Sequence, residues 1–89
     1  MRTARAAARL LAALPELVEK GNPNAASDAG SAALLLEAAA EAALLNVGIN
    51  LSGVSDAELV GRMQRETADL QEQTRRLRDQ VLAEVRRRF

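Results

Sequence analysis

An apolar stripe in the last third of the chain repeats every three or four residues without a break. Its members are Val60, Met63, Thr67, Leu70, Thr74, Leu77, Val81, Val85 and Phe89. This spacing is typical of one side of a single α-helix, which would be about 50 Å long at 1.5 Å per residue. A compact domain of this size has a radius of gyration of only about 12 Å. We therefore expect the far end of the helix to pack against another copy, to pack against a partner, or to be frayed.

The pattern as a whole predicts an all-α chain of three helices, over residues 3–20, 23–51 and 55–88. The first has an apolar stripe formed by Ala7, Leu10, Leu11, Leu14, Leu17 and Val18. Pro15 lies inside it and predicts a kink over residues 11–15, because proline removes a backbone donor and crowds the preceding turn. Lys20 and Gly21 are expected to end it, with the glycine in the left-handed conformation that follows many helices.

Polar residues mark the two junctions. Asn22 is predicted to cap the second helix, with Pro23 in its first turn, where no N–H is needed. Ser52 and Gly53 are predicted to end that helix. The sequence SDAE at residues 55–58 then predicts a capping box for the third helix, with Ser55 at the N-cap and Glu58 three positions later, flanked by Val54 and Leu59 as a hydrophobic staple.

We expect one cytoplasmic domain, residues 1–89, and its composition favours self-association. Apolar residues make up 48% of the chain, but many are alanine, and Phe89 is the one aromatic residue. Alanine buries little area, so a monomer would be marginally stable. The sequence contains no cysteine and no histidine, and we predict no metal site and no tightly bound cofactor. Helices of this type assemble as a bundle, so we expect a homodimer or a higher homo-oligomer.

Charge argues against two classes of partner. The 12 basic and 12 acidic residues cancel, and residues 86–88 are arginines at a helix end, where cations are favourable. We therefore expect no nucleic-acid binding. Residues 29–51 are long enough to span a bilayer, but Glu37 and Glu41 lie inside this stretch. A charge at the bilayer centre costs about 2.5–3.5 kcal/mol, so we expect no membrane helix.

The second helix carries a polar stripe. At 100° per residue, Asp28 and Asn46 fall at the same angle, and Asn24, Ser31 and Asn50 fall within about 60° of it. We expect Asn46 to be at least half buried and hydrogen-bonded, because it follows an apolar run on a helix that must pack. These residues alone leave two roles open. They either satisfy helix ends or bind a ligand.

Several segments together resemble a known family. They are Gly21-Asn22 with Asn24, Ser27-Asp28, Glu37, the run LNVGINL at residues 45–51, and Asp56. They are similar to the C-terminal half of the cyclodeaminase/cyclohydrolase family, which comprises the cyclodeaminase domain of formiminotransferase-cyclodeaminase and the methenyltetrahydrofolate cyclohydrolases. The similarity extends over essentially all 89 residues, which is about half the family's length.

The resemblance implies an all-helical fold that dimerises through long helices, and a tetrahydrofolate derivative as substrate. The reaction would close a formimino group into a ring with loss of ammonia, or open a methenyl bridge. Asp28 is expected at the catalytic position, where it stabilises and positions the cationic folate bridge. The implied substrate-binding residues are Asn22, Asn24, Ser27, Ser31, Asn46 and Asn50.

The half length leaves the activity open. The half that is missing relative to the family includes a glycine-rich turn, and the sequence does not decide whether a second polypeptide supplies it. Folate ends in carboxylates that require basic groups, and residues 21–61 contain none. The alternative function is a non-catalytic helical oligomerisation or assembly protein that retains the fold.

Overall fold

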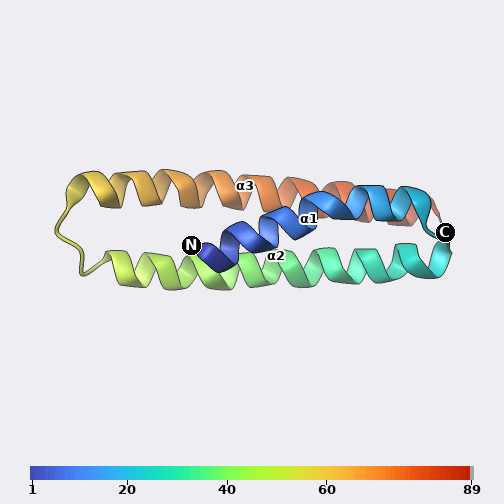
Figure 1. The fold of residues 1–89 in the computed structure, drawn as a ribbon, viewed down its shortest axis with the longest axis horizontal. Coiled ribbons are helices and arrows are strands. Elements are labelled where there is room, and N and C mark those ends of the chain that lie inside the picture. The colour runs from blue at the N-terminus through green and yellow to red at the C-terminus, as the bar shows by residue number, and fades with distance from the viewer. Residues whose placement is uncertain (89) are drawn as a thin grey trace.

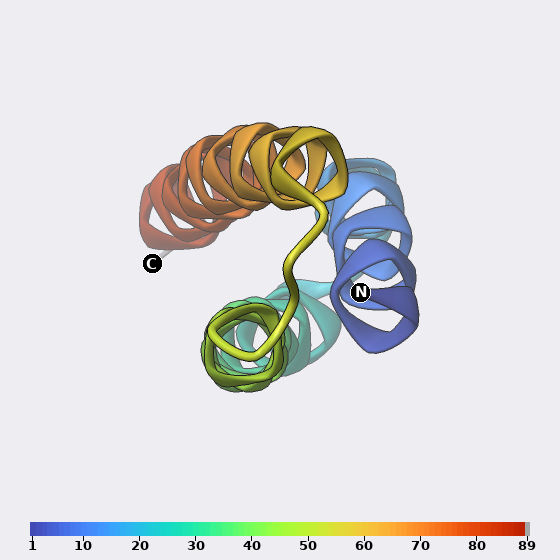
Figure 2. The ribbon, with the colours of Figure 1, turned by 90° about the vertical axis from the view of Figure 1, so that its left-hand side faces the viewer.

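The computed structural model describes residues 1–88, apart from the side chain of Pro23. Three helices make up this part of the chain: α1 (Arg2–Lys20), α2 (Pro23–Leu51) and α3 (Ala57–Arg87). They run up, down and up, so α2 is antiparallel to both neighbours (Figure 1). Seen end-on, they form a triangle (Figure 2). The predicted all-α fold and the three helices are confirmed, and residues 1–88 contain no strand.

The molecule is a rod, and its shape corrects one expectation. It measures 50 × 15 × 15 Å, with a radius of gyration of 15.1 Å. α2 is nearly as long as α3 and lies alongside it, so α3 packs on its own chain. Leu70 and Val81 of its stripe are buried there. The far end of α3 therefore does not require a partner. Phe89, the last predicted member of the stripe, lies outside the described residues.

The junction between α1 and α2 is tight. The amide of Ala25 donates to Asn22 Oδ1 at 2.9 Å, which confirms Asn22 as the N-cap of α2. Gly21 is not left-handed as predicted, since its φ is −87° and its ψ is 166°. Glycine is needed for space instead. A Cβ at this position would lie 2.8 Å from the carbonyl oxygen of Leu17 and 2.9 Å from Cβ of Ala25.

The junction between α2 and α3 moves the predicted cap by one residue. α2 ends at Leu51, and the hydroxyl of Ser52 donates to the carbonyl of Ile49 at 2.6 Å. Asp56 is the N-cap of α3, because its Oδ1 accepts from the amide of Leu59 at 3.1 Å. The capping box centred on Ser55 was wrong, and α3 begins at Ala57.

Small side chains dominate the core. The larger cluster joins Leu11, Leu14 and Val18 of α1, Ala26, Ala29 and Ala33 of α2, and Val81 and Val85 of α3. The predicted stripe on α1 has the right period but is too wide. Leu10 is 57% exposed and Leu17 is 58% exposed. α1 runs through Pro15 without interruption and bends part-way along its length (Figure 1).

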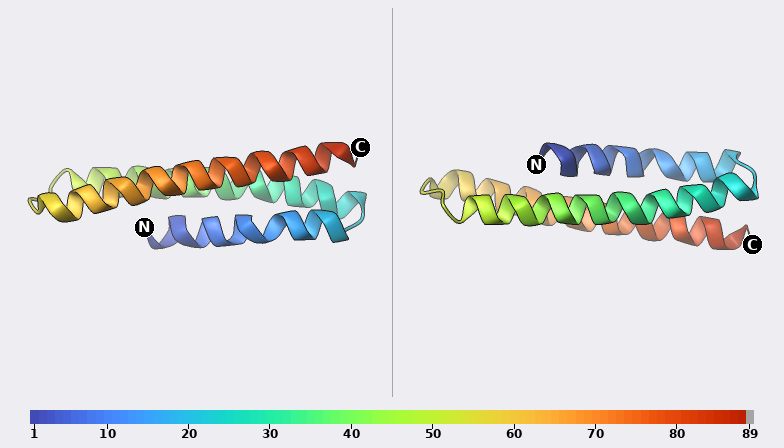
Figure 3. Two further views of the ribbon diagram at one scale, coloured as in Figure 1. Left: turned by 90° about the horizontal axis from the view of Figure 1, so that it is seen from above. Right: turned by 90° about the horizontal axis from the view of Figure 1, so that it is seen from below.

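α1 covers only part of the α2–α3 hairpin. Its first buried residues, Ala4 and Ala8, pack against Leu44 and Leu70. Beyond this level the hairpin continues without a third helix (Figure 3).

Ion pairs connect the helices along their flanks. Arg5 of α1 binds both carboxylate oxygens of Glu66 on α3, at 2.5 and 2.6 Å. On the other flank, Nη1 of Arg78 lies 3.4 Å from Oε2 of Glu37 on α2. Both acids inside the long apolar stretch of α2 therefore face α3, since Arg75 similarly pairs with Glu41.

α2 is long and apolar enough to cross a bilayer by length and composition, over Asn24–Leu51, where the mean hydropathy is 1.6. This is weak evidence, because core helices of soluble proteins and signal sequences meet the same criterion. The expectation that no helix spans a membrane stays a prediction.

Candidate functional site

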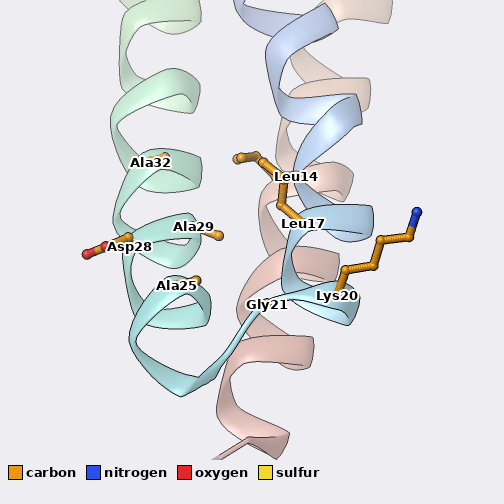
Figure 4. Close-up of a pocket in the computed structure, with 8 residues that line it drawn as sticks. All are labelled: Leu14, Leu17, Lys20, Gly21, Ala25, Asp28, Ala29 and Ala32. Atoms are coloured by element: carbon orange, nitrogen blue, oxygen red, sulfur yellow. The ribbon is translucent and has the colours of Figure 1, made fainter.

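An open groove of about 450 Å³ lies between α1 and α2, next to their junction. Its lining is formed by Leu14, Leu17, Lys20, Gly21, Ala25, Asp28, Ala29 and Ala32. The floor is apolar, and the two charged side chains stand at its rims. In Figure 4, Asp28 points away from α1, and Lys20 points away from α2. The groove therefore offers an apolar surface between the two helices, and the charged ends of both side chains are directed outward from its edges.

Asp28 lies near the start of α2, six residues after the N-cap Asn22. Its side chain is exposed and takes part in none of the ion pairs formed among residues 1–88. Asp28 thus offers a negative charge that no cation of the described chain neutralises by direct contact.

Lys20 closes the other rim from the last turn of α1. Its Nζ lies 2.7 Å from Glu16 Oε1, in an exposed pair one helical turn apart. Exposed pairs of this kind contribute little to stability. A carboxylate of a ligand could therefore take the place of Glu16 at small cost.

The predicted site residues fall into two groups on α2. Asn22, Asn24, Ser27, Asp28 and Ser31 lie at its start, and Asn46 and Asn50 lie near its end. All are exposed. Asp28 and Asn46 are about 27 Å apart along the helix, so one chain does not bring the two groups together. Of the predicted residues, Asp28 alone lines the groove.

Asn46 also departs from expectation. It lies on the exposed side of α2 and takes part in none of the side-chain hydrogen bonds within residues 1–88. The predicted hydrogen-bonded burial is therefore not found in a single chain.

The α1 side of the groove was missed from sequence. Leu14, Leu17 and Lys20 looked like an ordinary apolar stripe and a helix end. The available signal was the width of the apolar stripe. One neighbouring helix cannot bury a stripe this wide, so the residues left over must line a surface.

A second hollow of about 380 Å³ lies at the end of the hairpin that α1 leaves uncovered. It is lined by Gly48, Leu51, Ser52, Val60, Gln64 and Thr67. No charged side chain lines it, and it includes no predicted site residue.

The perturbed ionisable groups lie away from the groove. Hydrogen bonds from Arg5 lower the pKa of Glu66, and the same contact raises the pKa of Arg5. The pKa of Arg78 is raised by its hydrogen bond to Asp79 and, to a lesser degree, by Glu37. The Arg5–Glu66 shifts mark an ion pair between α1 and α3, whereas the Arg78 shift arises mainly from Asp79, its neighbour within α3.

Glu41 is the least well satisfied of the inter-helix acids. Its Oε2 accepts from Gln71 at 3.4 Å. Its Oε1 is buried and lies 3.1 Å from Arg75 Nη2, yet the geometry gives it no hydrogen bond. Residues 1–88 contain no cluster of three or more acidic residues able to hold a metal ion.

A family model described as formiminotransferase-cyclodeaminase matches residues 1–69. The chain belongs to the formiminotransferase-cyclodeaminase family. The match covers α1, α2 and the first part of α3, and it includes the groove and every predicted site residue. Residues 70–89 lie outside it, so the similarity extends less far than the sequence pattern indicated. A comparison with curated proteins and one with solved structures found no match.

Proposed function

We propose that this protein binds a reduced folate, formimino- or methenyl-tetrahydrofolate, in the groove between α1 and α2. Membership of the formiminotransferase-cyclodeaminase family indicates a context of folate-dependent one-carbon metabolism. The observation that supports the site is the position of Asp28. It is a carboxylate at the rim of an apolar groove that takes part in none of the ion pairs among residues 1–88, and it lies within the segment that carries the family resemblance.

The proposed roles follow from charge and shape. The alanines at residues 25, 29 and 32 present an apolar surface of small side chains to a flat ring system. The carboxylate of Asp28, once turned inward from the outward position that it has in Figure 4, stabilises the cationic one-carbon bridge. Lys20 pairs with a carboxylate of the glutamate tail after releasing Glu16. Lys20 thus supplies a basic group at the start of α2, although residues 21–61 contain none.

In the deaminating direction, N10 of the folate attacks the formimino carbon while the carbon–nitrogen bond to the departing ammonia breaks. The proton of N10 leaves with that nitrogen, so a formiminium cation becomes a methenyl cation and the net charge is unchanged. Asp28 faces a positive charge before and after the step. Its contribution is electrostatic positioning, which lowers the barrier only if the charge is held better in the transition state.

Asp28→Asn tests this proposal because it keeps the shape and deletes the charge. Asp69→Asn is the matched control, since Asp69 is an exposed acid on α3. Calorimetric titration with a methenyl- or formimino-folate should show binding by the parent and by Asp69→Asn. For Asp28→Asn we expect affinity at least tenfold weaker, or about 1.4 kcal/mol. A parent protein that neither binds nor converts the folate at millimolar concentration would overturn the proposal.

The second candidate is a non-catalytic assembly protein. One observation favours it. The outward face of α2 carries large apolar side chains, with Leu35, Leu45 and Ile49 each at least 70% exposed. An assembly protein would keep this face and would not respond to a reduced folate.

A further inference from the structure

The last turn of α1 lines the groove but has few anchors of its own. Leu17 and Lys20 of this turn, and Gly21 directly after it, face the groove. Val18 is the last buried residue of α1, and the two residues that follow it are exposed. The end of a helix also leaves its final carbonyls without a donor from the same helix. Such a turn frays unless another group holds it.

A residue from the far end of the described chain binds one of these carbonyls. Nη2 of Arg88 donates to the carbonyl oxygen of Glu19 at 3.2 Å. The amide of Gly21 donates to the carbonyl of Leu17 at 2.9 Å. The guanidinium also lies at the negative end of the α1 dipole, where a cation is favourable. Arg88 therefore acts as a C-terminal cap of α1 that is supplied by α3.

The sequence of α3 explains why Arg88, and not the arginine before it, reaches α1. Val81 and Val85 lie in the core cluster that α3 shares with α1. Residues three or four apart lie on the same side of a helix. Arg88 therefore continues the row of Val81 and Val85 at the point where this row leaves the core. Arg87 lies outside the row and pairs with Glu84 of α3 instead.

The junction between α1 and α2 transmits the position of this turn to α2. The two helices are separated by Gly21 and Asn22 alone. A Cβ at Gly21 would lie 2.9 Å from Cβ of Ala25, which shows how closely the junction packs. Ala25 and Asp28 line the groove from the α2 side. A shift of the last turn of α1 therefore alters the groove on its α1 side directly and on its α2 side through the junction.

We propose that Arg88 is a positioning residue for Lys20. By holding the carbonyl of Glu19, it fixes the backbone from which the Lys20 side chain projects at the rim of the groove. The effect on ligand binding rests on the proposed function, whereas the capping of α1 does not. Arg88 does not line the groove, so it acts through the turn alone. It also lies beyond residues 1–69, which match the family model, so the family resemblance does not imply this contact.

Hydrogen exchange tests the cap without any ligand. Arg88→Ala is compared with Arg86→Ala, which removes the same charge two positions away. Arg86 is exposed and takes part in none of the ion pairs among the residues that the structure describes. In Arg88→Ala, the amides of Glu19, Lys20 and Gly21 should exchange about two- to tenfold faster, as expected from the loss of one net hydrogen bond. Unchanged exchange in Arg88→Ala, or an equal rise in Arg86→Ala, would overturn the proposal.

A double-mutant cycle tests whether the cap acts through Lys20. Methenyl-tetrahydrofolate is titrated by calorimetry into variants whose helicity equals that of the parent. Lys20→Met and Arg88→Ala should each weaken binding at least about twofold, and Arg86→Ala should not. In the Lys20→Met background, Arg88→Ala should have almost no further effect, because residues that act as a unit are not additive.

The possible results separate the inference from the function on which it draws. If Arg88→Ala binds the folate as tightly as the parent, or if the two losses add, the positioning role is wrong even where hydrogen exchange confirms the cap. If the parent binds no folate, the proposed function fails and the positioning role fails with it, while hydrogen exchange still decides whether Arg88 caps α1.

Discussion

Two glycines inside α2 should respond differently to replacement by alanine. Gly30 faces α3, and a Cβ added there would lie 3.4 Å from Cγ2 of Val85 and 3.8 Å from Cδ2 of Leu82. These are ordinary van der Waals contacts, so alanine fits. Gly48 is exposed, and a Cβ added there would have no neighbouring atom within 4 Å. Gly48→Ala is therefore the control that changes helix propensity without changing packing.

The magnitude follows from two terms. Alanine in place of glycine inside a helix gains about 0.8–1.0 kcal/mol. At Gly30 the new methyl group is also buried, which adds up to about 0.8 kcal/mol. We expect Gly30→Ala to stabilise the fold by roughly 1.5–2 kcal/mol and Gly48→Ala by roughly 1 kcal/mol. In a domain of this size, each kcal/mol raises the thermal midpoint by about 4–8 °C.

Urea and thermal unfolding followed by circular dichroism measure both changes. All proteins are compared at one concentration, because self-association would make the midpoint concentration-dependent. If Gly30→Ala lowers the midpoint while Gly48→Ala raises it, α3 lies closer to α2 than the structure shows. If both lower it, the packing and propensity argument for α2 fails.

Three further experiments, with four substitutions, test the caps, the core and the charges. Asp56→Ala should cost about 1 kcal/mol and Ser55→Ala almost nothing; the reverse order in urea unfolding would restore the capping box. Leu11→Ala should cost about 2–5 kcal/mol, because this side chain is fully buried, and an unchanged urea midpoint would refute its burial. Arg5 lowers the pKa of Glu66 in the folded state, so its stabilisation is present above the unfolded pKa and is lost as the pH falls through the folded pKa. Urea unfolding across this acidic range should show a weaker pH dependence for Glu66→Gln, and an identical profile would contradict the ion pair.

The helices could be predicted because their signals are local. The apolar period of α3 and the pair Asn22-Pro23 depend on neighbouring residues alone, and every predicted helix boundary lies within two residues of the observed one. The cap of α3 was missed because Ser55 and Asp56 are both good N-caps. The choice between them depends on the path of the loop, which is set by how α2 and α3 pack.

The site was only partly predictable. Asp28 stood out because it is the acid on a polar stripe, and it does line the groove. The contributions of Leu17 and Lys20 depend on how α1 lies against α2, and no pattern within α1 reports that. The polar stripe was defined by angles around the axis of one helix and not by distances along it. It therefore could not show that Asn46 is remote from Asp28 in the same chain.

The distribution of side-chain size over the faces of α2 bears on how stable a single copy of the chain is. Toward α1 and α3 the helix buries mostly alanines, which let the three helices approach closely. Its larger apolar side chains, such as Leu35 and Leu45, point to solvent. An isolated bundle would place its larger side chains inward, where each buries more area and contributes more to stability. On α2 the arrangement is reversed: the described chain leaves Leu35, Leu45 and Ile49 exposed, so we expect this face to contribute little to the stability of a single copy.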